Sequence, residues 1–92
     1  MPERKLTELD PAWVAEDGQR VGVSFECPAD DGAHGIGVPF VKCDWSEGND
    51  SKAVWQKTGE TFEDLSLSPS IDCTKSGYCK FHGWVKNGIV SW

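Results

Sequence analysis

The apolar residues along the chain recur at spacings that predict several short β-strands. Between Arg20 and Cys27 they occupy every second position, which is typical of a strand with one buried face. Shorter apolar stretches that predict further strands lie at 36–43, 53–57 and 62–68. Pro39 has no N–H to donate, so it predicts an edge strand or a bulge, and Pro69 is expected to end the last stretch.

The C-terminal residues predict a β-hairpin. Residues 84–86 and 89–91 flank Asn87-Gly88, a dipeptide that suits a two-residue turn in which both positions need positive φ. The N-terminal arm, 1–19, is expected to be irregular or to form a short helical turn, because its apolar residues lie three and four apart. The predicted fold is therefore mainly β, with a small antiparallel sheet and a C-terminal hairpin, in a single domain spanning 1–92.

The length and charge of the chain limit both its core and its partners. It has 92 residues, of which 38% are hydrophobic, and a net charge of −6. A chain this short buries only about 60–65% of its unfolded surface, so we expect a metal, a disulfide or a partner to add stability. The acidic balance argues against passive binding to nucleic acid or to an anionic membrane. No apolar stretch follows the first residues, so we expect no secretory signal and a cytoplasmic location.

Four cysteines and two histidines are candidate metal ligands. Cys79 and His82 are close enough in sequence to bind one ion, and a stretch with Pro, Asp and Gly that favours a turn separates Cys27 from His34. Structural disulfides are rare in a reducing compartment. These four residues therefore predict a tetrahedral zinc site of the closed, structural type. Alternative ligands for the same ion are Cys43, Cys73, Asp30 and Asp31.

Tryptophan and lysine side chains are candidate binding residues. The chain has five tryptophans, and tryptophan is enriched at the energetic centres of protein interfaces. We expect Trp45, in a polar stretch, and Trp92, at the C-terminal end, to be exposed. Lys80 and Lys86 could contribute a basic binding face with Lys75, although solvated lysines at strand edges explain the same charge.

The common sequence patterns of enzymes are absent. The chain has no His-Glu-x-x-His, no Gly-x-Ser-x-Gly and no Gly-x4-Gly-Lys. We therefore expect no catalytic residue and a binding protein rather than an enzyme. Two alternatives stay open: a metal-dependent hydrolase with an open coordination position on zinc, and a nucleic-acid-binding module that uses the C-terminal lysines.

The order of several motifs resembles a family of small proteins of phages, prophages and bacteria. These motifs are Cys27-Pro28, His34, Leu65-Ser66-Leu67-Ser68-Pro69-Ser70-Ile71, Cys79-x-x-His82-Gly83 and Asn87-Gly88. The resemblance implies a zinc-binding domain of the zinc-ribbon kind and brings no activity with it. Family members often have further cysteines directly after Cys-Pro, where this chain has Ala29, Asp30 and Asp31. This departure makes His34 more important as a ligand.

Together these observations predict an accessory protein of the phage or prophage type. We expect it to act by binding another protein, for which the host cell is one source, with zinc in a structural role. The motivation is the lack of catalytic motifs in a small, acidic chain that is rich in tryptophan.

Overall fold

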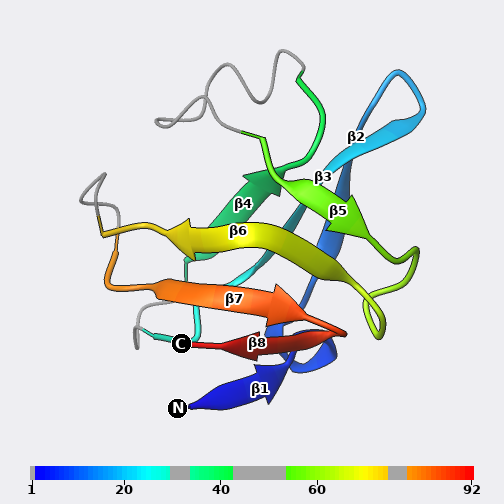
Figure 1. Cartoon of the computed structure of the whole chain (residues 1–92). Helices are drawn as coiled ribbons and strands as arrows, with labels where there is room; N and C mark the ends of the chain where they lie inside the picture. The colour runs from blue at the N-terminus through cyan, green and yellow to red at the C-terminus, as the bar shows by residue number, and fades with distance from the viewer. Residues whose placement is uncertain (1, 30–33, 43–53, 75–78) are drawn as a thin grey trace.

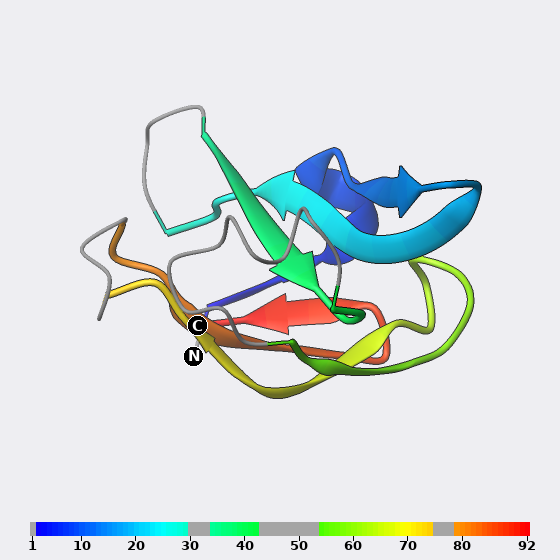
Figure 2. The ribbon, with the colours of Figure 1, turned by 90° about the horizontal axis from the view of Figure 1, so that it is seen from above.

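The computed structural model describes residues 2–29, 34–42, 54–74 and 79–92, which form two antiparallel sheets packed as two layers (Figures 1 and 2). The larger sheet has the strand order β1-β8-β7-β6-β5, with β1 at Glu3–Lys5, β5 at Gln56–Thr58, β6 at Ser66–Asp72, β7 at His82–Lys86 and β8 at Ile89–Ser91. The smaller sheet has the order β2-β3-β4, with β2 at Ala12–Glu16, β3 at Gln19–Glu26 and β4 at Gly35–Pro39. The prediction of a mainly β, antiparallel fold is confirmed.

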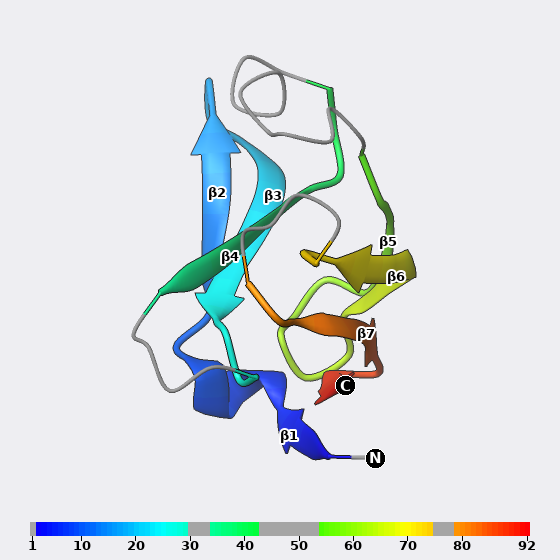
Figure 3. The same ribbon diagram turned by 90° about the vertical axis from the view of Figure 1, so that its left-hand side faces the viewer.

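The hydrophobic core lies between the two layers, which Figure 3 shows side by side. The alternation along β3 directs Val23 and Phe25 inward. They meet side chains from the opposite sheet, where the Phe25 and Phe81 rings pack edge to face with their centroids 6.1 Å apart. Burial of apolar surface between the layers is the main force that holds the sheets together.

The C-terminal hairpin is confirmed, whereas the prediction for the N-terminal arm is only partly right. Asn87 and Gly88 both have positive φ, 50° and 75°, at the turn between β7 and β8. In the arm, only Leu6–Leu9 is helical, as the 3₁₀ helix η1. The flanking strands β1 and β2 pair with β8 and β3, because sheet edges supply hydrogen-bond partners that local spacing does not reveal. Among the described residues, no helix is long and apolar enough to cross a membrane.

The two prolines behave differently from each other. Pro39 ends β4, an edge strand of the smaller sheet, as predicted. The prediction that Pro69 ends a strand is wrong, because Pro69 lies inside β6. The pairing of β6 with β7 shifts between Leu67 and Ile71, and such a bulge tolerates a residue that cannot donate to the ladder.

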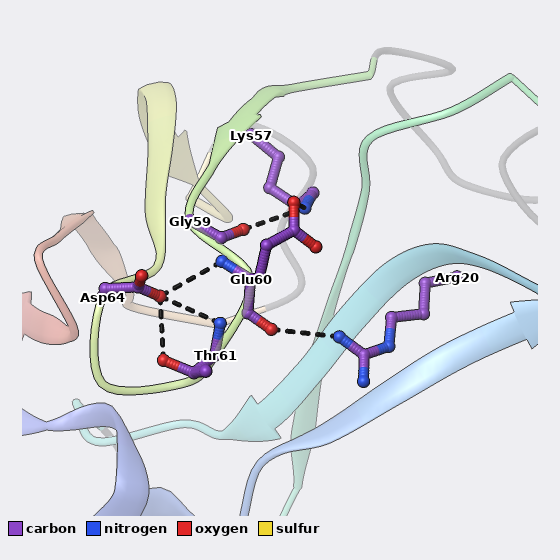
Figure 4. A network of polar contacts seen from close by, with 6 residues as sticks. All are labelled: Arg20, Lys57, Gly59, Glu60, Thr61 and Asp64. Atoms are coloured by element: carbon purple, nitrogen blue, oxygen red, sulfur yellow. Dashed lines mark hydrogen bonds and ion pairs between the residues drawn. The ribbon is translucent and has the colours of Figure 1, made fainter.

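A polar network organises the loop after β5 (Figure 4). Oδ1 of Asp64 accepts hydrogen bonds from the main-chain N–H groups of Glu60 and Thr61, at 3.1 and 2.9 Å, and from the Thr61 hydroxyl at 2.8 Å. The main-chain hydrogen bond from Thr61 lowers the pKa of Asp64 most, and the hydrogen bond from the Thr61 hydroxyl lowers it further. The carboxylate thus fixes the loop in the way that a capping side chain fixes a helix end.

The same loop is tied to the smaller sheet by one arginine. Arg20 Nη1 donates to the Glu60 carbonyl at 3.0 Å, and its guanidinium lies 4.4 Å from the centre of the Trp13 ring. Trp13 in turn stacks on Phe62, with ring centroids 4.7 Å apart. The hydrogen bond from Arg20 to Glu60 (Figure 4) and the stack of Trp13 on Phe62 join the two sheets at the end where the β5–β6 connection lies.

A glycine near the start of β7 provides a test of the packing. A Cβ on Gly83 would overlap the main-chain oxygen of Ser91 and lie 2.8 Å from Cζ of Phe81, whereas a Cβ on Gly35 would meet only the Phe25 oxygen at 3.8 Å. Gly83→Ala should therefore lower the free energy of unfolding by about 1–3 kcal/mol. Gly35→Ala should be neutral or slightly stabilising. Urea denaturation of both variants measures this difference, and equal stabilities would contradict the packing described.

Candidate functional site

Three predicted metal ligands come together where the two sheets meet. Cys27 follows β3, His34 precedes β4 and Cys79 precedes β7. Their potential ligand atoms all lie within 4.8 Å of one another. The main-chain N–H of Cys27 donates to the His34 carbonyl at 3.0 Å, which places these two residues side by side. The cluster could hold a metal ion.

The environment of the cluster suits a buried ion. The Sγ atoms of Cys27 and Cys79 are 3.7 Å apart, and no disulfide joins the three cysteines in the described part of the chain. Cys27 is only 5% exposed, and Nε2 of His34 is shielded from solvent. Two thiols and an imidazole in an apolar setting form a soft donor set, which favours transition metals over calcium or magnesium.

Cys73, named above as an alternative ligand, lies beside this cluster. It follows β6, and its N–H donates to the Phe81 carbonyl at 2.9 Å. Burial, together with the neighbouring thiols of Cys79 and Cys27, raises the pKa of Cys73 to about 12. A bound cation acts in the opposite direction, because coordination deprotonates a thiol. Cys73 is thus close enough to Cys79 and Cys27 for their thiols to interact with its own.

The structure does not bring His82 to the cluster, in contrast to the sequence prediction. Cys79 precedes β7, and His82 is the first residue of that strand. Phe81 and Gly83 are buried while His82 is exposed, so the alternation of the strand directs the imidazole away from the core. Close spacing in sequence made Cys79 and His82 look like a ligand pair, but the intervening start of a strand separates them.

The other predicted residues have mixed outcomes. Trp92 is half-buried and packs against the core, whereas exposure was expected. Its main-chain N–H donates to the Pro2 carbonyl at 3.1 Å, which holds the end of the chain there. Lys80 and Lys86 are both exposed. Predicted residues that lie outside the described part of the chain are Asp30, Asp31, Cys43, Trp45 and Lys75.

A serine and a histidine form a second group, on the outer face of the larger sheet. Oγ of Ser70, in β6, lies 3.4 Å from Nε2 of His82, in β7. In the tautomer with its proton on Nδ1, Nε2 of His82 can accept the hydroxyl proton. A hydroxyl beside an imidazole is the arrangement of a nucleophile and its general base.

The bulge in β6 brings Ser70 to this position. Leu67 pairs with Val85 and Ile71 with Gly83, so the three residues between Leu67 and Ile71 face one residue of β7. The Ser68–Pro69 peptide bond in this segment is cis. Trp55 Nε1 donates to the Ser70 carbonyl at 3.2 Å and secures the main chain there. Bulges commonly redirect side chains at active sites.

Two further side chains surround the histidine. The ring of Trp84 stacks on that of His82, with centroids 5.5 Å apart and an interplanar angle of 24°. Asp72 stands directly opposite His82 in the β6–β7 register. Oδ1 of Asp72 accepts hydrogen bonds from the N–H of Thr74 at 2.9 Å and from the Thr74 hydroxyl. The imidazole of His82 thus stacks on an indole and has a carboxylate residue opposite it on the neighbouring strand.

Sequence reasoning missed Ser70. Its segment, 65–71, was recognised as a motif and assigned no chemistry, and His82 was assigned to the metal. The available signal was that this serine-rich motif ends one predicted strand and the Cys-x-x-His motif directly precedes the next one. Adjacent antiparallel strands bring their side chains into contact.

One protein-family model matches the chain over almost its whole length. A family model described as BubE, bacterial ubiquitination-like system serine protease, matches residues 2–92. The chain belongs to the BubE family. None of the curated proteins and none of the solved structures matches it. The BubE match concerns a bacterial ubiquitination-like system and neither supports nor opposes the predicted resemblance to phage proteins.

Proposed function

We propose that this protein is a serine protease of a bacterial ubiquitination-like system, with Ser70 as nucleophile and His82 as general base. The observation that carries this proposal is the 3.4 Å separation between Oγ of Ser70 and Nε2 of His82, in a chain of the BubE family. A contact of this length tightens when substrate orders the site. The binding-protein prediction is compatible with this, since a protease must first bind a protein.

The chemistry follows from the two side chains. Oγ of Ser70 attacks the carbonyl carbon of the scissile peptide bond while its proton passes to Nε2 of His82. The protonated imidazole then gives that proton to the leaving amine as the C–N bond breaks, which leaves an ester on Ser70. A water molecule, deprotonated by the same nitrogen, hydrolyses the ester and restores the serine hydroxyl.

The exposure of Ser70 and His82 to solvent bears on the kind of substrate. His82 is exposed and Ser70 is half-buried, so solvent reaches the pair until a substrate covers it. Exclusion of water strengthens the electrostatic interactions that stabilise the transition state. A polypeptide laid across the sheet provides such cover, and this favours a protein substrate over a small ester.

We further propose that zinc occupies the cluster of Cys27, His34 and Cys79, with Cys73 as the fourth ligand. Two thiolates bound to tetrahedral zinc at about 2.3 Å lie about 3.8 Å apart, and the sulfurs of Cys27 and Cys79 are 3.7 Å apart. Four protein ligands make a closed, structural site. The donor set therefore supports a structural metal more strongly than the metal-dependent hydrolase considered above. Cysteines that stay reduced are typical of a reducing compartment, which agrees with the expected location in the cytoplasm.

The serine mechanism predicts a sharp difference between two neighbouring serines. Ser70→Ala should lower kcat for peptide hydrolysis by about 10³–10⁴-fold, and His82→Ala should have a similar effect. Ser68→Ala is the matched control, because Ser68 is exposed in the same bulge and has no described contact with His82. Hydrolysis of quenched fluorescent peptides measures all three. Full activity in Ser70→Ala, or equal losses in both serine variants, would contradict the assignment.

The zinc proposal predicts which substitutions remove the metal. Protein purified without chelator should contain about one zinc per chain by elemental analysis. Cys27→Ser, Cys73→Ser and Cys79→Ser should each lose zinc and thermal stability. His82→Ala should keep both, because its imidazole faces the other side of the sheet. Retention of zinc in Cys73→Ser would leave an open coordination position, and loss in His82→Ala would return His82 to the ligand set.

A further inference from the structure

The outer face of β7 presents three chemically different side chains in one row. His82, Trp84 and Lys86 are exposed, and the residues between them are buried. Successive outward residues of a strand lie about 7 Å apart. The row therefore begins at the proposed base, passes an indole and ends at an ammonium group about 14 Å from the base.

The indole in this row is accessible. Trp84 is 42% exposed, and in the part of the chain that the structure describes it is one of two exposed large hydrophobic residues, with Val41. Its ring stacks on His82, so a group bound over Trp84 lies directly beside the base. An exposed tryptophan with a fixed ring orientation offers contact area at low entropic cost.

The far end of the row carries two positive charges. Lys86 pairs with Ile89 on β8, and Ile89 pairs with Lys5 on β1. Lys5 and Lys86 thus lie on the same face, two strands or about 10 Å apart, and both are exposed. Two acidic residues lie near this pair. Glu3 is in the row of Trp84, and Glu8 accepts a hydrogen bond from the main-chain N–H of Lys5 at 3.1 Å and pairs with Arg4 at 3.9 Å. In a chain of net charge −6, the two lysines make a local site for an anion.

We propose that this row is the substrate-binding track, and that the substrate is an extended polypeptide segment with an acidic side chain about four residues from the scissile bond. This inference rests on the proposed protease function. An extended segment along β7 advances by the same distance per residue as the strand. With its scissile bond at Ser70, it places its neighbouring residues over Trp84 and its acidic residue at Lys86 and Lys5. Charge complementarity then sets the direction in which the segment lies.

The test uses quenched fluorescent peptides in which one position at a time is Asp, Glu or Gln. Wild-type protein should cleave peptides with the acid at one position, about four residues from the bond, at higher kcat/KM than the matched Gln peptides. In Lys86→Glu the ratio of acidic to neutral kcat/KM should fall by about tenfold, since attraction becomes repulsion. Lys42→Glu makes the same charge change beyond β4 in the smaller sheet and should keep the wild-type ratio.

The variants at Trp84 separate binding from folding. Trp84→Ala should raise KM for all peptides, and Trp84→Phe should return KM most of the way to the wild-type value.

Cleavage with no preference for peptides with an acidic residue, or an unchanged ratio in Lys86→Glu, would overturn the track and leave the protease assignment standing. If wild-type protein cleaves no peptide or protein substrate, both the track and the protease function are overturned.

Discussion

The rest of the molecule depends on the junction at which Cys27, His34 and Cys79 bring the two sheets together. Cys27 and His34 come from the smaller sheet and Cys79 from the larger one, with their ligand atoms within 4.8 Å. Ser70 lies three residues before Cys73, and His82 lies three residues after Cys79. The junction therefore fixes the ends of the two strands that carry the proposed nucleophile and base, and a metal there would stiffen both.

The alternation of strand side chains separates the two chemistries. One face of β6 and β7 contributes Ile71 and Val85 to the core, while the other face presents the serine, histidine and tryptophan. The thiol cluster lies on the core side and the Ser70–His82 pair on the solvent side. A domain of this size can have both because they lie on opposite sides of the larger sheet. The bulge between Leu67 and Ile71 is the irregularity in β6 beside the pair.

Local patterns predicted the elements whose signals are local. The alternation along 20–27 and the Asn87-Gly88 turn were sufficient for β3 and the hairpin, and the proximity of Cys27 to His34 was predicted correctly. Orientation was harder to predict. Whether His82 points toward the thiols or toward Ser70 depends on where β7 begins, and a shift of one residue reverses the face. Ser70 depends on a bulge around Pro69, and the burial of Trp92 depends on tertiary packing.

The most direct test of the account is the location of the covalent adduct that an organophosphorus fluoridate forms with the protein. Such reagents phosphorylate a serine that a neighbouring imidazole activates, with release of fluoride. Peptide mapping by mass spectrometry after a short exposure should place one adduct on Ser70 and none on Ser66 or Ser68, and His82→Ala should abolish it. An adduct on another residue, or no adduct in folded protein, would contradict the claim that Ser70 and His82 form the active site.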